Sequence, residues 1–344
     1  MKIANDKINN RPPQILPETG GVYLAQYLNV FKTYLSDPHV SEICINKPGE
    51  VWIERMGCAH MLRYENADIT ADMLLRLGRL VASFSDQSLS LEKPLLSAAL
   101  PGGERIQFAL PPAARNGVAL SIRKQVIQDM SLSDYTACGA FENTRITDPR
   151  HKDAQDRHLR TLLAEHKLQD FISQAVKARK NILVSGGTST GKTTLLNAML
   201  KEVDATERII TIEDTPEVRP PHQNHLSLIA SKGEQAKAKL TIQDLLESAL
   251  RFRPDRILLG ELRGSEAYSF LRAVNTGHPG SITTIHADTP QGAFEQIALM
   301  VMQGNNSLTR DQIMTYTKSI IDIVVQLKRT GGKRHISEIW YPER

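Results

Sequence analysis

The residues best suited to chemistry lie in one glycine-rich segment near the middle of the chain. Residues 186–193 read GGTSTGKT and match the pattern G-x-x-x-x-G-K-[ST]. An apolar run, 182–184, precedes them and a helix-forming run, 194–200, follows, which predicts a strand, a glycine loop and a helix. Backbone N–H groups of such a loop close around a β-phosphate, and the helix N-terminus adds positive potential. The segment therefore predicts a binding site for a nucleoside triphosphate.

Individual side chains of this loop have distinct expected roles. Lys192 should reach the β- and γ-phosphates, and the Thr193 hydroxyl should ligate Mg²⁺. We therefore expect ATP and Mg²⁺ as ligands. The residues expected to hold the nucleotide are Gly187, Thr188, Ser189, Thr190, Gly191, Lys192, Thr193 and Thr194.

Two later apolar runs each end in carboxylates. Residues 256–261 end in Glu261, the Walker B arrangement in which a strand aims an acidic group at the metal and the attacking water. Because no Asp precedes it, Glu261 is the candidate general base and a candidate metal ligand. Residues 208–214 end in Glu213 and Asp214, which could hold Mg²⁺ through water because strand ends of a parallel sheet meet at the nucleotide crevice. A turn or capping role for Asp214 stays open.

A histidine follows a third predicted strand. A Gly/Pro turn at 276–280 leads into the hydroxyl-rich run 281–285 and then His286. At the end of a strand parallel to the one before Glu261, His286 is placed to sense the γ-phosphate through a hydrogen bond. The pair His222 and His225 has too few partners for a zinc site.

Length and composition describe an ordinary globular chain. Its 344 residues leave room for two or three domains, and 41% hydrophobic and 23% charged residues are typical values. The net charge of +4 permits acidic partners but demands none. Apolar runs are too short to span a bilayer and residues 1–13 lack an apolar signal region, so we expect a cytoplasmic protein. Three cysteines (Cys44, Cys58, Cys138) form no CxxC pair and fit a reducing compartment.

The first part of the chain predicts a small α+β domain. Helical spacing is found at residues 24–35 and 70–84. Strand-like runs follow at 41–46, 50–55, 95–100, 105–110 and 118–123. The first two runs join through Lys-Pro-Gly and the next two through Pro-Gly-Gly, both hairpin turns. Helices mixed with antiparallel hairpins indicate an α+β sandwich.

A polar stretch with little periodicity, residues 136–156, is the best linker candidate. It divides the chain into an N-terminal domain at 1–135 and a second domain at 157–344. In the second domain helices alternate with short apolar runs at 181–185, 208–213, 256–261, 281–285 and 321–327. Such runs predict an α/β domain with a mostly parallel sheet covered on both faces.

Four motifs in register resemble one family: GGTSTGKTT, RIITIEDTPE, RPDRILLGELRGSEA and NTGHPGSITTIHADTP. Over roughly residues 15–340 the chain resembles the traffic ATPases of bacterial type IV secretion systems, a branch of the type II/IV secretion ATPase superfamily. In that family these segments are the Walker A loop, Asp box, Walker B and His box.

The resemblance implies an N-terminal PAS-like domain and a RecA-like ATPase domain, assembled as a homo-hexamer. It also implies ATP hydrolysis that powers substrate translocation or pilus assembly by a conjugation-like system. The implied partners are other secretion-system ATPases and inner-membrane components, with peripheral association at the cytoplasmic face of the inner membrane.

The family also supplies arginines from its N-terminal domain to the nucleotide phosphates. Arg105 and Arg123 sit where the family places them, and a planar guanidinium matches spread phosphoryl charge. Arg263, just after Glu261, is a further candidate for coupling domains or subunits. Surface roles stay open for all three arginines.

Two departures from the family pattern bear on this site. Ser189-Thr190 replaces the Gly-Ser of many relatives, a mild change at free loop positions. The long, charged linker leaves open which subunit's N-terminal domain covers which ATP site.

Other functional classes fit less well. A RecA-like DNA translocase or recombinase would need a basic strip or aromatic loops, yet only 5% of residues are aromatic and 232–239 is the only notable basic loop. Direct nucleic-acid binding is left open. No N-K-x-D guanine signal follows the glycine loop, which disfavours a GTPase. Intact Lys192, Thr193 and Glu261 disfavour an inactive, nucleotide-gated platform.

Overall fold

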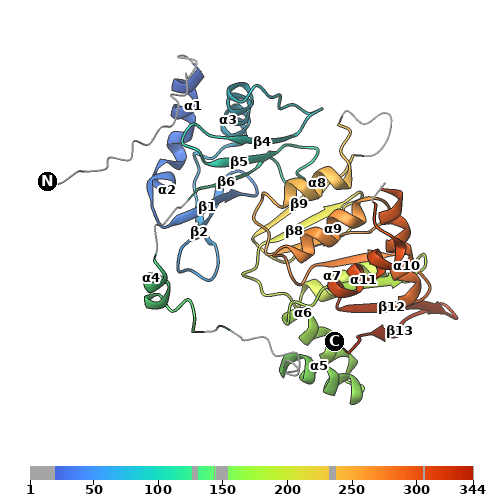
Figure 1. Cartoon of the computed structure of the whole chain (residues 1–344). Coiled ribbons are helices and arrows are strands. Elements are labelled where there is room, and N and C mark those ends of the chain that lie inside the picture. Colours follow the sequence, from blue (N-terminus) through green and yellow to red (C-terminus); the bar gives the residue numbers. More distant parts are fainter. Residues whose placement is uncertain are drawn as a thin grey trace.

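Two β-sheets with their covering helices form the body of the protein (Figure 1). The computed structural model describes residues 20–125, 131–142, 144, 154–231, 238–304 and 307–343. Within them, the N-terminal sheet has six strands and the C-terminal sheet has seven. No helix in these ranges is long and apolar enough to cross a bilayer.

The N-terminal sheet is antiparallel, in the order β3-β2-β1-β6-β5-β4. Its strands are β1 (Val40–Ile45), β2 (Glu50–Arg55), β3 (Leu62–Glu65), β4 (Leu95–Ala99), β5 (Arg105–Ala109) and β6 (Ala119–Arg123). Helix α3 (Ala71–Phe84) packs on this sheet and begins at Thr70, whose hydroxyl accepts the Met73 N–H at 3.1 Å. The fold class expected from the sequence is confirmed here.

Two details of this domain differ from the sequence expectation. The helix expected at 24–35 is divided into α1 (Gly20–Leu28), the 3₁₀ turn η1 (Asn29–Phe31) and α2 (Lys32–Ser36), and the turn buries Phe31. Strand β3 was not expected, because all four of its residues are exposed and show no buried alternation.

The C-terminal sheet has the order β13-β12-β7-β11-β10-β8-β9. Its strands are β7 (Ile182–Gly186), β8 (Ile209–Glu213), β9 (His225–Ile229), β10 (Arg256–Leu259), β11 (Ile282–Ile285), β12 (Ile323–Thr330) and β13 (Lys333–Trp340). All neighbouring strands are parallel except β12 and β13, which form an antiparallel hairpin. The mostly parallel sheet is therefore confirmed, while its two edge strands, β9 and β13, were not expected.

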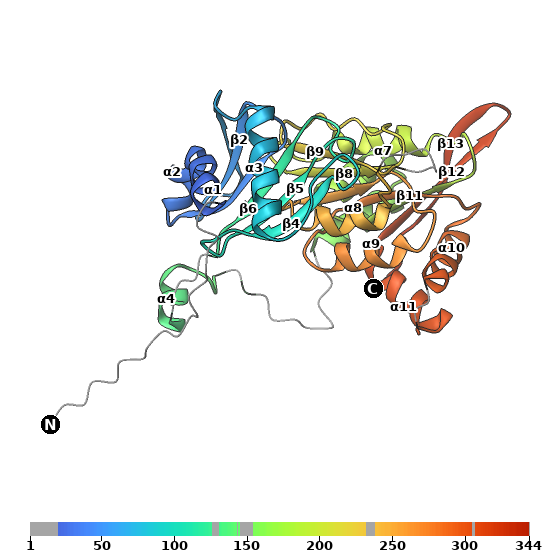
Figure 2. The ribbon, with the colours of Figure 1, turned by 90° about the horizontal axis from the view of Figure 1, so that it is seen from above.

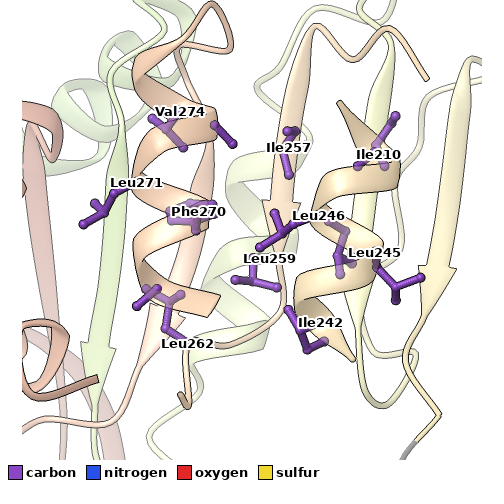
Figure 3. Packing of buried hydrophobic residues seen from close by; sticks show 14 of the residues in the cluster. Ile210, Ile242, Leu245, Leu246, Ile257, Leu259, Leu262, Phe270, Leu271 and Val274 are labelled. Atoms are coloured by element: carbon purple, nitrogen blue, oxygen red, sulfur yellow. The ribbon is translucent and has the colours of Figure 1, made fainter. Parts of the chain in front are cut away.

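Helices cover both faces of the C-terminal sheet. One face holds α5 (Ala154–Ala164), α6 (Leu168–Lys177) and α7 (Lys192–Leu200). The other holds α8 (Ile242–Ala249), α9 (Glu266–Asn275), α10 (Pro290–Gln303) and α11 (Arg310–Ile320). Successive residues of one strand serve opposite faces: Ile257 and Leu259 meet α8 and α9, whereas Leu258 joins the other cluster (Figure 3). Double coverage explains why four inner strands of this sheet, β7, β8, β10 and β11, are buried along their whole length.

Backbone hydrogen bonds join the N-terminal domain to one edge of the C-terminal sheet. Ile229 N–H donates to Ala113 O at 2.8 Å, and Arg115 N–H donates to Ser227 O at 3.0 Å. The loop that holds Ala113 and Arg115 thus continues the C-terminal sheet beyond β9. Ala113 also belongs to the same apolar cluster as the strands of that sheet.

A fully buried arginine strengthens this junction. The side chain of Arg208 donates to Asn46 Oδ1 at 2.7 Å and to Phe252 O at 2.8 Å. Asn46 in turn donates to Asn224 Oδ1 at 3.0 Å. A buried charge is tolerated only when it is well hydrogen-bonded, so these contacts fix the position of the two domains within one chain.

The expected linker borders two short helical elements. Helix α4 (Leu132–Ala137) overlaps its start, and α5 begins at Ala154, two residues before its expected end. Much of 136–156, and most of the basic loop expected at 232–239, lies outside the described residues. The domain limits therefore stay a prediction.

Candidate functional site

The glycine-rich loop leaves β7 and enters α7, as the motif predicts. Ser189 has φ +60° and Gly191, the residue before the helix, has φ +96°. The left-handed conformation suits Gly191 and strains Ser189, which carries a side chain. The buried Thr190 hydroxyl donates to Gly187 O at 2.9 Å and holds the loop closed. Thr188 and Thr194 are exposed and Thr193 is half-buried.

Lys192 lies at the centre of the site. Its ammonium donates to Gly186 O at 2.9 Å and Gly187 O at 3.2 Å, and it lies 3.3 and 3.4 Å from the two ring nitrogens of His286. Burial lowers the pKa of Lys192, although the carboxylate of Glu261 opposes that shift. Phosphate oxygens are stronger acceptors than these carbonyls, so a bound nucleotide would draw Lys192 away from them.

Glu261 is held on both sides. It follows β10 by two residues and is therefore past the strand end rather than within the strand. One carboxylate oxygen, Oε1, lies 2.7 Å from His286 Nε2. The other, Oε2, accepts from Arg263 at 2.6 and 2.8 Å, and Arg263 also binds Asp214. Three predicted site segments, ending at Glu261, Asp214 and His286, therefore meet in one network beside Lys192.

Backbone groups hold Glu213, one of the residues expected at the metal. Glu213 is 2% exposed, and its Oε1 accepts the N–H groups of Glu217 and Val218 at 2.8 and 2.7 Å. Glu213 Oε2 is buried without a hydrogen-bond partner among the described residues. Burial raises the pKa of the Glu213 carboxyl group. The role of Glu213 in a water-mediated metal site stays a prediction. The described residues contain no cluster of three or more acidic, histidine or cysteine ligands.

Arg105 and Arg123 lie away from this site within the same chain. They line a cavity of about 1040 Å³ together with Arg179, Pro254 and His278. Those three residues precede β7, β10 and β11 respectively, so the cavity opens at the amino ends of the parallel strands. The glycine loop and Glu261 follow the carboxyl ends. The structure thus unites Lys192, Glu261 and His286 but does not bring the two arginines to them.

The two arginines nevertheless have the character of an anion site. Arg105 and Arg123 are direct cross-strand partners, and both side chains are exposed. Like charges in such positions destabilise a sheet. Neither makes a hydrogen bond or ion pair within the described ranges, although Arg123 faces the buried Glu42 on the next strand. A pair kept at such a cost suits a negatively charged ligand from outside this chain.

One residue beside the loop was not anticipated from the sequence. A Cβ placed on Gly191 would lie 3.3 Å from Cδ of Arg334, a residue of β13. No motif marks Arg334, because it reaches the loop from a hairpin far along the chain. The only available signal was the basic run around the Gly-Gly turn.

Comparisons with known proteins give matches along nearly the whole chain. Residues 28–330 match the family model T2SSE, described as type II/IV secretion system protein. The chain is 41% identical over 347 residues to the type IV secretion system protein VirB11 of Bartonella quintana, covering 97% of each protein. It is 38% identical over 333 residues to the type IV secretion system protein PtlH of Bordetella pertussis, covering 92% of this chain and 94% of that protein.

A solved structure agrees with the arrangement of both domains. The VirB11 ATPase from the Brucella suis type IV secretion system, crystallised in complex with sulphate, superposes with a TM-score of 0.86 at 37% identity. The match covers 93% of this chain and 97% of that one. The similarity therefore includes the way in which the two domains are packed together.

Proposed function

We propose how the ATP site of this chain works and what process it drives. The chain belongs to the type II/IV secretion system protein family and is an ATP hydrolase related to type IV secretion ATPases. The observation that carries the proposal is the convergence of Lys192, Glu261 and His286 at one edge of the parallel sheet. Each comes from a different motif, and each lies where a nucleotide on the glycine loop would meet it.

The loop and helix α7 bind the triphosphate. Backbone N–H groups from Gly187 to Thr194 surround the phosphates, and Lys192 exchanges its carbonyl partners for β- and γ-phosphate oxygens. The Thr193 hydroxyl would ligate Mg²⁺, with Glu213 and Asp214 acting through water. A Mg²⁺ ion held by these residues would supply positive charge that neutralises the charge developing on the phosphates.

Glu261 prepares the water for attack. It accepts a proton from the water as the water oxygen bonds to the γ-phosphorus and the bond to the ADP oxygen breaks. His286 and Arg263 hold the carboxylate in place. His286 also lies near Lys192, so it can transmit the presence of a γ-phosphate to both residues.

A second chain completes the site. Within one chain, Arg105 and Arg123 lie in the cavity at the amino ends of the parallel strands, away from the glycine loop, so we propose that they stabilise the γ-phosphate on the glycine loop of a neighbouring chain. A head-to-tail contact of this kind closes into a ring, and a homo-hexamer is the assembly that we propose. Hydrolysis would release the arginines and allow the N-terminal domains to swing, which supplies mechanical work.

The work serves a type IV secretion system. We propose that the ring powers substrate translocation or pilus assembly at the cytoplasmic face of the inner membrane. Other secretion ATPases and inner-membrane components would be its partners. The full-length similarity to VirB11 and PtlH supports this proposal.

Phosphate release by the purified chain tests the enzymatic part. Activity per chain should rise with protein concentration as rings assemble, and Lys192→Ala should abolish it without unfolding the protein. Turnover by Lys192→Ala near the wild-type rate would show that the site is elsewhere. In the host bacterium, a strain carrying Lys192→Ala should lose secretion, and normal secretion by that strain would refute the proposed motor role.

A further inference from the structure

The tip of the β12–β13 hairpin overhangs the glycine loop. Strand β12 pairs with the loop's own strand, β7, and the last pair joins Leu327 to Gly186, the final residue of β7. Strand β12 continues for three more residues, Lys328 to Thr330, before the chain turns back into β13. The hairpin therefore extends past the end of the sheet on the side of the loop, and Figure 2 shows it projecting from the body.

Arg334 brings a guanidinium to the loop backbone. A Cβ on Gly191 would lie 3.3 Å from Arg334 Cδ and 3.9 Å from its Nη1. Glycine at this position leaves the backbone open to close approach. Arg334 therefore faces Gly191 on the side where any other residue would carry its Cβ, directly before Lys192.

The hairpin tip concentrates positive charge. Lys328, Arg329, Lys333, Arg334 and His335 are all exposed, and no acidic residue occurs between 323 and 337. Arg329 and Arg334 are direct cross-strand partners, a destabilising pair of like charges. Within the described parts of the chain, the side chain of Arg334 makes no hydrogen bond or ion pair. An anion held beside Gly191 would relieve this repulsion.

We propose that Arg334 is a nucleotide-binding residue of its own chain, in which its guanidinium binds the phosphates held by the glycine loop. The inference rests on the proposed function of that loop. A guanidinium can donate two parallel hydrogen bonds to one phosphate, which a single loop N–H cannot do. Arg334 differs from Arg105 and Arg123 in that it needs no neighbouring chain, so its effect is present in an isolated protomer.

Equilibrium binding of a fluorescent ADP derivative, methylanthraniloyl-ADP, tests the inference. Titrations are made on the full chain at a protein concentration too low for assembly, so arginines of other chains contribute nothing. Arg334→Ala should raise the dissociation constant about tenfold, the size of one good charge-assisted contact. Arg334→Lys should recover part of the affinity, because it keeps the charge but loses the two-bond geometry. The matched control, Arg329→Ala, removes the same charge from the opposite strand and should change the constant less than about twofold.

Each outcome of these titrations decides between clear alternatives. Equal losses in Arg334→Ala and Arg329→Ala would mean diffuse attraction by a basic tip, as expected for a hairpin that binds an acidic macromolecule, and would overturn the inference. Unchanged affinity in Arg334→Ala, with binding lost in Lys192→Ala, would also overturn it while leaving the proposed function intact. Failure of the wild-type chain to bind the probe would instead refute the proposed function. Far-ultraviolet circular dichroism verifies that each variant is folded, and Arg334→Lys replaces Arg334→Ala if the latter is not.

Discussion

The chain contains two pairs of arginines whose members are cross-strand partners. One pair lies near the carboxyl ends of the parallel strands of the ATPase domain, and the other near their amino ends. Arg329 and Arg334 pair at the tip of the C-terminal hairpin, with Arg334 beside Gly191 of the same chain. Arg105 and Arg123 pair on the N-terminal sheet, in the cavity at the amino ends of the parallel strands. Each pair costs the folded chain some stability. We propose that the chain's own nucleotide relieves the repulsion in the first pair, whereas a nucleotide on another chain relieves it in the second.

This difference separates binding from hydrolysis. A single protomer carries all the groups proposed to hold nucleotide and orient water, because Lys192, Glu261 and His286 converge within it. Arg105 and Arg123, the arginines proposed to stabilise the γ-phosphate, do not lie near these residues in the same chain. Under our proposal, a single chain binds ATP but hydrolyses it rapidly only when it is assembled with others, so turnover depends on assembly.

Among the residues proposed to prepare the attacking water, Glu261 should have the largest effect on turnover. Glu261→Gln keeps the shape of the side chain and an acceptor oxygen for Arg263 but removes the basic oxygen. Turnover should fall about 100-fold or more while ATP affinity stays within about twofold. Single-turnover kinetics beside equilibrium binding provide the measurement. A large loss of affinity with unchanged turnover per bound ATP would instead identify Glu261 as chiefly a metal or structural group.

A smaller effect is expected from Arg263, which positions Glu261 and binds Asp214. Arg263→Ala should lower kcat roughly tenfold with little change in KM, because it disorders the base without removing a phosphate contact. Its side chain is 52% exposed, so the melting temperature should hardly change. A drop in stability that accounts for the lost activity, or a rise in KM alone, would contradict a positioning role.

A third prediction concerns stability rather than turnover, and it involves the charge that faces Arg123. Burial raises the pKa of Glu42 to about 7, and the nearby Glu54 adds to the rise. A hydrogen bond from Ser121 and the charges of Arg123 and Arg208 lower this pKa, but by less. A carboxyl whose folded pKa is raised destabilises the fold above that pKa, and the penalty disappears below its unfolded pKa of 4.5.

Glu42→Gln should therefore be more stable than wild type at pH about 8, by up to ~3 kcal/mol. The difference should shrink towards pH about 5. Urea unfolding at both pH values measures it. A difference that stays constant with pH would show that Glu42 does not titrate in this range.

Much of the fold followed from local patterns that the structure confirms. The buried strands β7, β8, β10 and β11 are apolar because helices cover both faces of the sheet, and this property is legible in the sequence. Strands β3 and β13 were missed because they are largely exposed, so burial imposes no pattern on them. Edge strands are chosen by their pairing partners, which the linear sequence does not display.

The residues of the proposed site also divide into those that a sequence motif identifies and those that it does not. Lys192, Glu261 and His286 were identified because each belongs to a motif at the end of a buried strand. Arg334 was not, because its position depends on the register between β12 and β7 rather than on its neighbours in sequence. The placement of Arg105 and Arg123 depends on how the domains pack, and the contacts that decide it, such as Arg208 with Asn46, join residues far apart in the chain.

The central claim is that one ATP site needs two chains, and mixing two inactive variants tests it most directly. Lys192→Ala lacks a working glycine loop, and Arg105→Ala/Arg123→Ala lacks the arginines. The two are purified separately, mixed in equal amounts, allowed to exchange subunits and assayed for phosphate release. Arg263→Ala mixed with Lys192→Ala is the matched control, because the defect of Arg263→Ala lies on the same chain as its glycine loop.

In a randomly mixed ring, a site works when an intact loop meets intact arginines on the next chain. The mixture should then recover roughly a quarter of wild-type activity, while the Arg263→Ala control should show no gain over its parents. No recovery in the mixture, with both variants shown to assemble into shared rings, would contradict the claim and mean that the arginines act on the site of their own chain or on no site.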